Sequence, residues 1–228
     1  MPPIVLKAFL PLVFLLMGTS KLPGEFVAHR TSDSVVAGGS LRTTANDDAM
    51  IKPGASVGSL KLGDNRDRAR QVFPFKTDVD QESDTEACGT EYLWVDSENE
   101  QRGNVFIRFQ KSEVFQIEAA TTRFHTSEGI KALDSPGKVR QHYRGLKAYV
   151  LLHNSPMALG GGPLIFWVDW TKGLAFMFAT ERSETQRYLY SIAVFRPGGR
   201  FCPNGESTDS PDWHELRPYS LQAPKQSN

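Results

Sequence analysis

The sequence predicts an α+β fold made of two related halves, each a helix followed by antiparallel strands, that form one compact body. Residues 64–73 align without gaps with residues 134–143, and both segments carry the apolar spacing of a short amphipathic helix. Runs rich in aromatic and β-branched residues follow each segment, as is typical of strands. The connections between these runs are too short for crossover helices, so we expect antiparallel meanders.

The internal similarity extends beyond the helices. Aspartate, arginine and glutamine are identical at three of the ten aligned positions, and the order of the later matches is the same in both parts. We interpret the pattern as a duplication, with repeats at about 50–122 and 123–200. The later matches pair 94–96 with 167–169 and 105–109 with 174–178.

Each predicted helix has a start signal and a core-facing stripe. Short polar side chains accept hydrogen bonds from the first free amides of a helix, which favours Asp64 as one N-cap and Asp134 or Ser135 as the other. Pro136 suits a first helical position. The stripes are Ala69, Val72 and Phe73 in one segment and Val139, His142 and Tyr143 in the other. The predicted strands are Glu91–Val95, Asn104–Phe109, Glu113–Ala119, Ala148–Leu152, Leu164–Asp169, Leu174–Ala179 and Tyr188–Phe195.

Residues 1–20 have the pattern of a cleavable secretion signal. Lys7 supplies the positive charge, residues 8–17 form an apolar run, and residues 18–20 are small. A membrane-spanning helix needs about 20 apolar residues, about twice this run. We therefore expect cleavage and a secreted or periplasmic protein without a membrane span.

The remaining chain divides by composition. Residues 21–49 are rich in small and polar residues and predict a flexible linker. Residues 50–218 have the size of one domain. Residues 219–228 are polar and predict a disordered tail.

Charge and cysteine content limit the partners. Lys plus Arg and Asp plus Glu both number 26, so the basic excess typical of nucleic-acid binders is absent. Cys88 and Cys202 are the two cysteines, and export favours a disulfide between them over two separate thiols. By restricting the unfolded chain, such a bridge stabilises the folded state by an amount on the order of 4–5 kcal/mol. No closely spaced cysteine pair supports zinc, and we expect no cofactor.

The candidate catalytic residues are better explained by structural roles than by catalysis. Ser56 lies in a Gly-x-Ser-x-Gly pentapeptide, but the strand before it and the helix after it that a nucleophile elbow needs are missing. Asp96 and Asp169 stand at equivalent strand ends, where aspartate forms turns more often than it acts as an acid or base. The histidines have no ligand-pair spacing, and His142 is interpreted as a partly buried structural residue; the five are His29, His125, His142, His153 and His214.

Tryptophans are the best candidate binding residues. Trp167 and Trp170 are three residues apart, so along one strand they point to opposite faces of the sheet. We expect one to be in the core and select Trp170 as the candidate binding residue. The alternative is that loops or the other half cover both.

The run from Val57 to Asp64, leading into a helix that ends at Val72 and Phe73, resembles the opening of a small exported module. That module occurs in SmpA/OmlA outer-membrane-assembly lipoproteins and, duplicated, in β-lactamase-inhibitory proteins. The resemblance implies helices packed on an antiparallel sheet and no enzymatic activity. The chain departs from the family in lacking a lipobox cysteine and in showing one clear helix per half, and no functional residue carries over.

Three functions remain as hypotheses. The first is an exported, non-catalytic protein that binds another exported or envelope protein through its sheet. The second is an exported hydrolase that uses Ser56 or the pair Asp96 and Asp169. The third is a carrier of a small ligand, which requires an aromatic-lined pocket between sheet and helix.

Overall fold

A computed structural model of the chain describes residues 47–74, 81–85, 88–96, 103–151, 163–180, 187–203 and 213–221. The chain divides into two units, Met1–Leu41 and Arg42–Asn228, and every described residue belongs to the second. The predicted signal peptide, and the linker as far as residue 46, lie outside the described residues.

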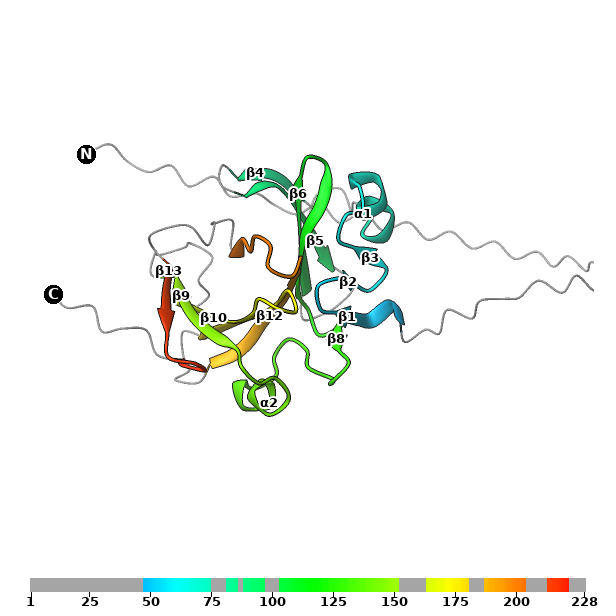
Figure 1. Cartoon of the computed structure of the whole chain (residues 1–228). Helices are drawn as coiled ribbons and strands as arrows, with labels where there is room; N and C mark the ends of the chain where they lie inside the picture. The colour runs from blue at the N-terminus through cyan, green and yellow to red at the C-terminus, as the bar shows by residue number, and fades with distance from the viewer. Residues whose placement is uncertain are drawn as a thin grey trace, which may run out of the picture. The chain divides into compact units, whose positions relative to one another are not determined.

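A nine-stranded antiparallel sheet dominates the structure (Figure 1). Its strands follow the order β13-β9-β10-β11-β12-β7-β6-β5-β4. The meander from β9 to β12 and the meander from β4 to β7 meet where β12 pairs with β7. The strands are β4 (Gln81–Thr85), β5 (Gly89–Asp96), β6 (Gly103–Gln110), β7 (Glu113–Ala120), β9 (Lys147–Leu151), β10 (Leu164–Asp169), β11 (Leu174–Thr180), β12 (Arg187–Phe195) and β13 (Trp213–Leu216).

A second, smaller sheet and two short helices accompany the large sheet. The small sheet has the order β3-β2-β1-β8, and its β1–β8 pair is parallel. These elements are β1 (Met50–Lys52), β2 (Ser56–Val57), β3 (Leu60–Lys61), β8 (His125–Thr126), α1 (Arg66–Val72), α2 (Pro136–His142) and a 3₁₀ turn, η1 (Asp47–Ala49).

The predicted α+β class with two separate helix-plus-sheet halves is wrong. Strands contain 51% of the described residues and helices 13%, so the fold is mostly β. The halves do not form separate sheets, because β7 and β12 are hydrogen-bonded neighbours inside one continuous sheet. The error arose because short extended segments without clear alternation, including β1, β2, β3 and β8, went unrecognised beside two correctly placed helices.

The two helices have similar local structures. The side chains of Asn65 and Ser135 cap α1 and α2, each accepting from the amide three residues later. Ser135 was one of the two predicted caps, whereas the predicted cap Asp64 lies one residue too early. Its carboxylate instead accepts from the Lys61 amide, and Asp134 accepts in the same way from Lys131. The duplication itself stays a prediction.

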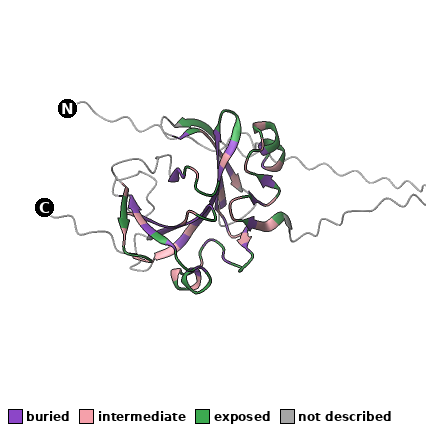
Figure 2. Ribbon diagram, viewed as in Figure 1, coloured by how far each residue is buried: buried purple, intermediate pink, exposed green. Residues whose placement is uncertain are grey.

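Alternation along the strands divides the side chains of the large sheet between two faces. We call the side of the large sheet that packs against both helices and the small sheet the helical face. Its hydrophobic cluster includes Ala69 from α1 and Val139 from α2. We call the opposite side of the large sheet the inner face. It carries a second hydrophobic cluster, which includes Phe166, Phe195 and Phe201. Figure 2 shows buried residues along most of the large sheet. Trp167 is buried on the helical face.

The ordered body extends past the predicted start of the disordered tail. The Tyr219 hydroxyl donates to the carbonyl of Tyr143, and its ring lies 5.3 Å from that of Trp167. Leu221 also packs against the core. Residues 222–228 lie outside the described residues. Within the described ranges, no helix is long and apolar enough to cross a membrane.

Candidate binding surface on the inner face

Half-buried aromatic side chains gather on the inner face of the large sheet. They pack against the cluster formed by Phe166, Phe195, Phe201 and neighbouring aliphatic residues, and they come from β9, the turn after β10, β12 and β13. We call these four residues the aromatic surface: Tyr149, Trp170, Tyr190 and Trp213. The sequence predicted one of them, Trp170, and the structure places it on the face opposite Trp167, as expected.

The turn between β10 and β11 fixes the position of Trp170. One carboxylate oxygen of Asp169 accepts from the Thr171 amide, the Thr171 hydroxyl and the Lys172 amide. Gly173 closes the turn with a φ of +64°, and a Cβ there would lie 1.9 Å from the carbonyl oxygen of Phe195. Asp169 therefore has the turn-forming role that the sequence favoured over catalysis.

Three of the four rings of the aromatic surface are in edge-to-face contact, because Tyr149 lies between Trp170 and Trp213. The Tyr149 centroid lies 6.0 Å from Trp170 at an interplanar angle of 86° and 5.7 Å from Trp213 at 67°. The Trp170 indole donates to the Tyr149 hydroxyl over 3.0 Å. These rings form an uneven, rigid relief and not a coplanar stacking platform.

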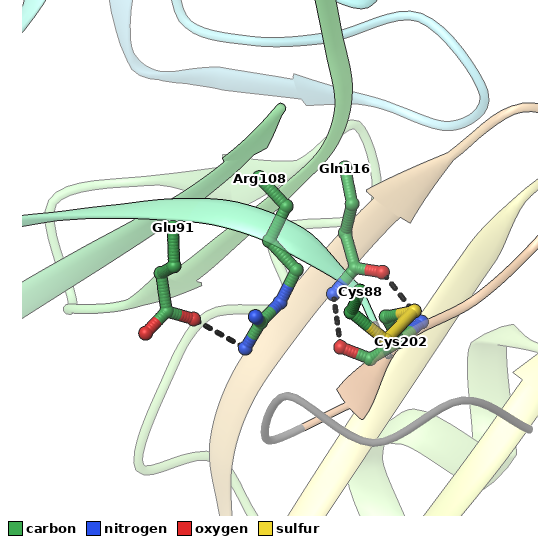
Figure 3. Close-up of a disulfide and its surroundings, with 5 residues drawn as sticks. All are labelled: Cys88, Glu91, Arg108, Gln116 and Cys202. Atoms are coloured by element: carbon green, nitrogen blue, oxygen red, sulfur yellow. Dashed lines mark hydrogen bonds and ion pairs between the residues drawn. A yellow bond between two sulfur atoms is a disulfide. The ribbon is translucent and has the colours of Figure 1, made fainter. Parts of the chain in front are cut away.

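A disulfide and a buried amide anchor the segment that carries Phe201. Cys88 and Cys202 are bonded, which confirms the predicted pairing. Gln116 of β7 donates from its side chain to the Cys202 carbonyl over 3.0 Å and accepts from the Cys202 amide over 2.8 Å (Figure 3). Phe201, one residue earlier, lies 5.0 Å from Phe195 and 5.9 Å from Phe166. The disulfide thus stabilises the floor of the aromatic surface.

Charged groups are buried beside this anchor, on the inner face of β5 to β7. Arg108 is 2% exposed and forms an ion pair with Glu91, toward which its guanidinium points in Figure 3. Its Nε and Nη1 atoms have no hydrogen-bond partner among the described residues. Glu118 accepts from the Ser191 hydroxyl over 2.7 Å.

Burial shifts the acid–base properties of this region. Desolvation raises the pKa of Glu118 above its ordinary value, and the hydrogen bond from Ser191 and the charge of Arg108 offset only part of that rise. Burial, together with the nearby Glu118 charge, raises the pKa of Tyr190 to about 12. Tyr190 therefore stays neutral to a higher pH than an exposed tyrosine.

The proposed catalytic groups are not brought together. Ser56 is buried in β2, and no hydrogen bond among the described residues joins it to a histidine. Its strand lacks a following helix, as expected from the sequence. Asp96 ends β5 and Asp169 ends β10, and the large sheet places four strands between β5 and β10. Backbone positions 96 and 169 are therefore too far apart in the sheet to act on one substrate bond.

The histidines do not form a metal site in the described part of the chain, where no group of three ligating side chains occurs. His125 lies in β8 and contacts the carbonyl of Thr126. His142 is exposed, so the prediction that it is partly buried is wrong; it ends α2 on the solvent side, and Val139 and Tyr143 provide the buried contacts. His29 and His153 lie outside the described residues.

Comparison with known proteins gives little further information. No family model and no curated protein matches the chain. One solved structure with some similarity is a cysteine-rich secretory protein from Staphylococcus aureus, with 12% identity and a TM-score of 0.36. The match covers 64% of this chain and 47% of that protein, so the chain spans about half of its length. A similarity of this size supports no inference about fold or function.

Sequence reasoning missed most of the aromatic surface. Tyr149 lies in a predicted strand, where its alternation with Ala148 and Val150 could have placed it on the inner face. Trp213 lies in β13, a four-residue strand preceded by Ser, Pro and Asp that gives no strand signal. Their proximity depends on β9 pairing with both β10 and β13, which the chain order alone does not reveal.

Proposed function

We propose that the chain is an exported, non-catalytic binding protein that uses the aromatic surface to contact another exported or envelope protein. The observation that carries this proposal is the gathering of four half-buried aromatic side chains over one rigid cluster on the inner face. Tryptophan and tyrosine dominate the binding energy of protein interfaces because they bury a large area at a small loss of conformational entropy.

The ring geometry favours a protein partner over a flat ligand. Sugars and nucleobases stack on the face of an exposed ring, whereas here the Tyr149 ring meets both Trp170 and Trp213 at steep angles. An uneven relief of ring edges suits the side chains of a protein surface.

Export is supported by two features of the chain. Residues 1–20 have the charge, apolar length and small-residue pattern of a secretion signal. The buried disulfide between Cys88 and Cys202 supports the same location, because disulfides persist in oxidising compartments. We infer a secreted or periplasmic location. The resemblance of residues 57–73 to SmpA/OmlA and β-lactamase-inhibitory proteins, which are exported and non-enzymatic, agrees with this proposal.

Capture of partners from the exported fraction tests the proposal. The bait is the mature protein, and the variants are Trp170→Ala, Trp213→Ala and the double substitution. We expect the wild type to capture a specific partner. The double variant should bind that partner about tenfold or more weakly, because each of the two aromatic contacts contributes about 1–2 kcal/mol to binding. Leu133→Ala is the matched control, because Leu133 is a large apolar residue that is 56% exposed in the segment before α2.

The outcome is decided by the comparison between variants and not by capture alone. A partner bound equally well by the wild type and by the Trp170 and Trp213 double variant would place the interface elsewhere and contradict the proposal. Retained far-ultraviolet circular dichroism and a cooperative unfolding transition above the assay temperature show that the variants are folded. Turnover of a substrate by the wild type, unaffected by these substitutions, would also count against it.

A further inference from the structure

The turn between β6 and β7 and the segment after β12 together form a small basic cavity. Its volume is about 310 Å³, which is at the lower end of the range for small-molecule sites. Three of its lining residues, Lys111, Arg196 and Arg200, are cationic, and only Glu113 is acidic. The chain as a whole has equal numbers of acidic and basic residues, so this concentration of positive charge is local.

The charge of the cavity is not neutralised from within. Arg196 forms a long ion pair of 3.6 Å with Glu113, and both side chains are 62% exposed. Lys111 and Arg200 form no ion pair or side-chain hydrogen bond within the described part of the chain. The cavity therefore carries a net charge of two from its own lining, one acidic and three basic groups. Such a cluster creates a positive potential that attracts an anion.

Tight turns fix the backbone of the cationic residues on both sides of the cavity. Lys111 and Ser112 have φ angles of 52° and 68° and form the two-residue turn between β6 and β7. Asparagine or glycine adopts this conformation with less strain, so lysine occupies the tip at a conformational cost. Opposite it, the Gly199 amide donates to the Arg196 carbonyl over 2.8 Å and closes a tight turn between the two arginines.

Arg200 is tethered close to the disulfide. Cys202, two residues later, is bonded to Cys88, and both its backbone groups are hydrogen-bonded to Gln116. This anchoring reduces the entropy that a ligand must offset when it orders the arginine. Buried Val114 and half-buried Phe115 supply the apolar part of the lining.

We propose that this cavity binds a phosphate group, carried either by a soluble molecule or by a lipid headgroup. Two guanidinium groups, an ammonium group and the amide of Gln110 match the several oxygen acceptors of a phosphate better than one carboxylate. The inference does not depend on the aromatic surface, because none of its four residues lines the cavity.

Binding measurements with two phosphate sources test the proposal. Glycerol phosphate is the soluble probe, and phosphatidylcholine vesicles with and without phosphatidylglycerol are the lipid probe. We expect the wild type to bind at least one of these phosphates, with an affinity that falls as salt is added. Lys111→Ala with Arg200→Ala is expected to raise the dissociation constant about tenfold, since both unpaired cations are lost.

A charge-matched control separates a site from a general charge effect. Arg144→Ala with Arg217→Ala removes two exposed cations outside the cavity lining, and we expect wild-type affinity. Binding of glycerol phosphate, or of the phosphatidylglycerol vesicles alone, supports the proposal and identifies the source. Absence of binding to both probes, or an equal loss in the two double variants, overturns it. Chemical shift changes confined to residues 110–115 and 196–200 would locate the bound phosphate independently.

Discussion

Removal of the disulfide is the perturbation for which the structure gives the clearest magnitude. The bonded cysteines are separated by 114 positions in the sequence. In the chain-entropy model, a closed loop of that length stabilises the folded state by about 5 kcal/mol, because it restricts the unfolded chain. We therefore expect Cys88→Ala with Cys202→Ala to lower the free energy of unfolding by up to about 5 kcal/mol, with the fold retained.

Gln116 gives an independent measure of the same anchor. Its two hydrogen bonds to the Cys202 backbone act on the folded state, whereas the disulfide acts chiefly on the unfolded chain. Gln116→Leu leaves a buried amide and a buried carbonyl without partners, which costs about 2–4 kcal/mol. Because Gln116 contacts Cys202 directly, the two losses are expected to couple by about 0.5–3 kcal/mol, and the combined variant measures this coupling.

Urea denaturation followed by tryptophan fluorescence provides the assay. The wild type, the double cysteine variant, Gln116→Leu and their combination are compared at one pH and temperature, and the wild type is repeated with reductant. The reasoning is refuted if the cysteine variant loses less than about 1 kcal/mol at an unchanged m-value. A combined loss well below the sum would mean that the segment around Cys202 leaves the sheet when the disulfide is absent.

The remaining predictions concern stability. Trp167→Ala should lower the free energy of unfolding by about 3–5 kcal/mol in urea denaturation, because the side chain is 1% exposed and its indole donates to the Ser220 carbonyl. Ser135→Ala should lower it by about 1 kcal/mol through loss of the α2 cap. Glu118 has a raised pKa in the folded state, so its burial lowers stability as pH rises from 4.5 through the folded-state pKa. Glu118→Gln should remove this fall. In urea denaturation at a series of pH values, the stability of the variant relative to the wild type should therefore improve as the pH rises above 4.5, and a constant difference would contradict the raised pKa.

The sequence predicted those strands and helices whose residue patterns are strong over a few neighbouring positions. Strands such as Leu164–Asp169 have continuous apolar and aromatic runs, and the structure places β10 at the same residues. The helices followed from caps and apolar spacing within a single turn. The fold class was wrong for two reasons. Short strands such as β1 and β2 gave no clear signal, and the pairing of β12 with β7, which joins the two meanders in one sheet, leaves no local signal.

The candidate site was predictable to a smaller extent, for the same reason. Trp170 could be found because the three-residue offset from Trp167 assigns the two rings to opposite faces of the sheet. Trp213 could not, since its place beside Tyr149 results from β13 pairing with β9 across a long stretch of chain. The disulfide was predictable because two cysteines allow one intramolecular pairing.

The segment after β12 connects the features on which both proposals depend. Arg200 lines the basic cavity, Phe201 packs beneath the aromatic surface, and Cys202 bonds to the residue just before β5. Three consecutive residues thus face three different environments, and the last of them, Cys202, is held by Gln116 as well as by the disulfide. The disulfide therefore supports both candidate sites as well as the stability of the fold. Reduction of this bond should weaken binding at the aromatic surface and at the basic cavity, whereas Trp170→Ala should weaken binding at the aromatic surface alone.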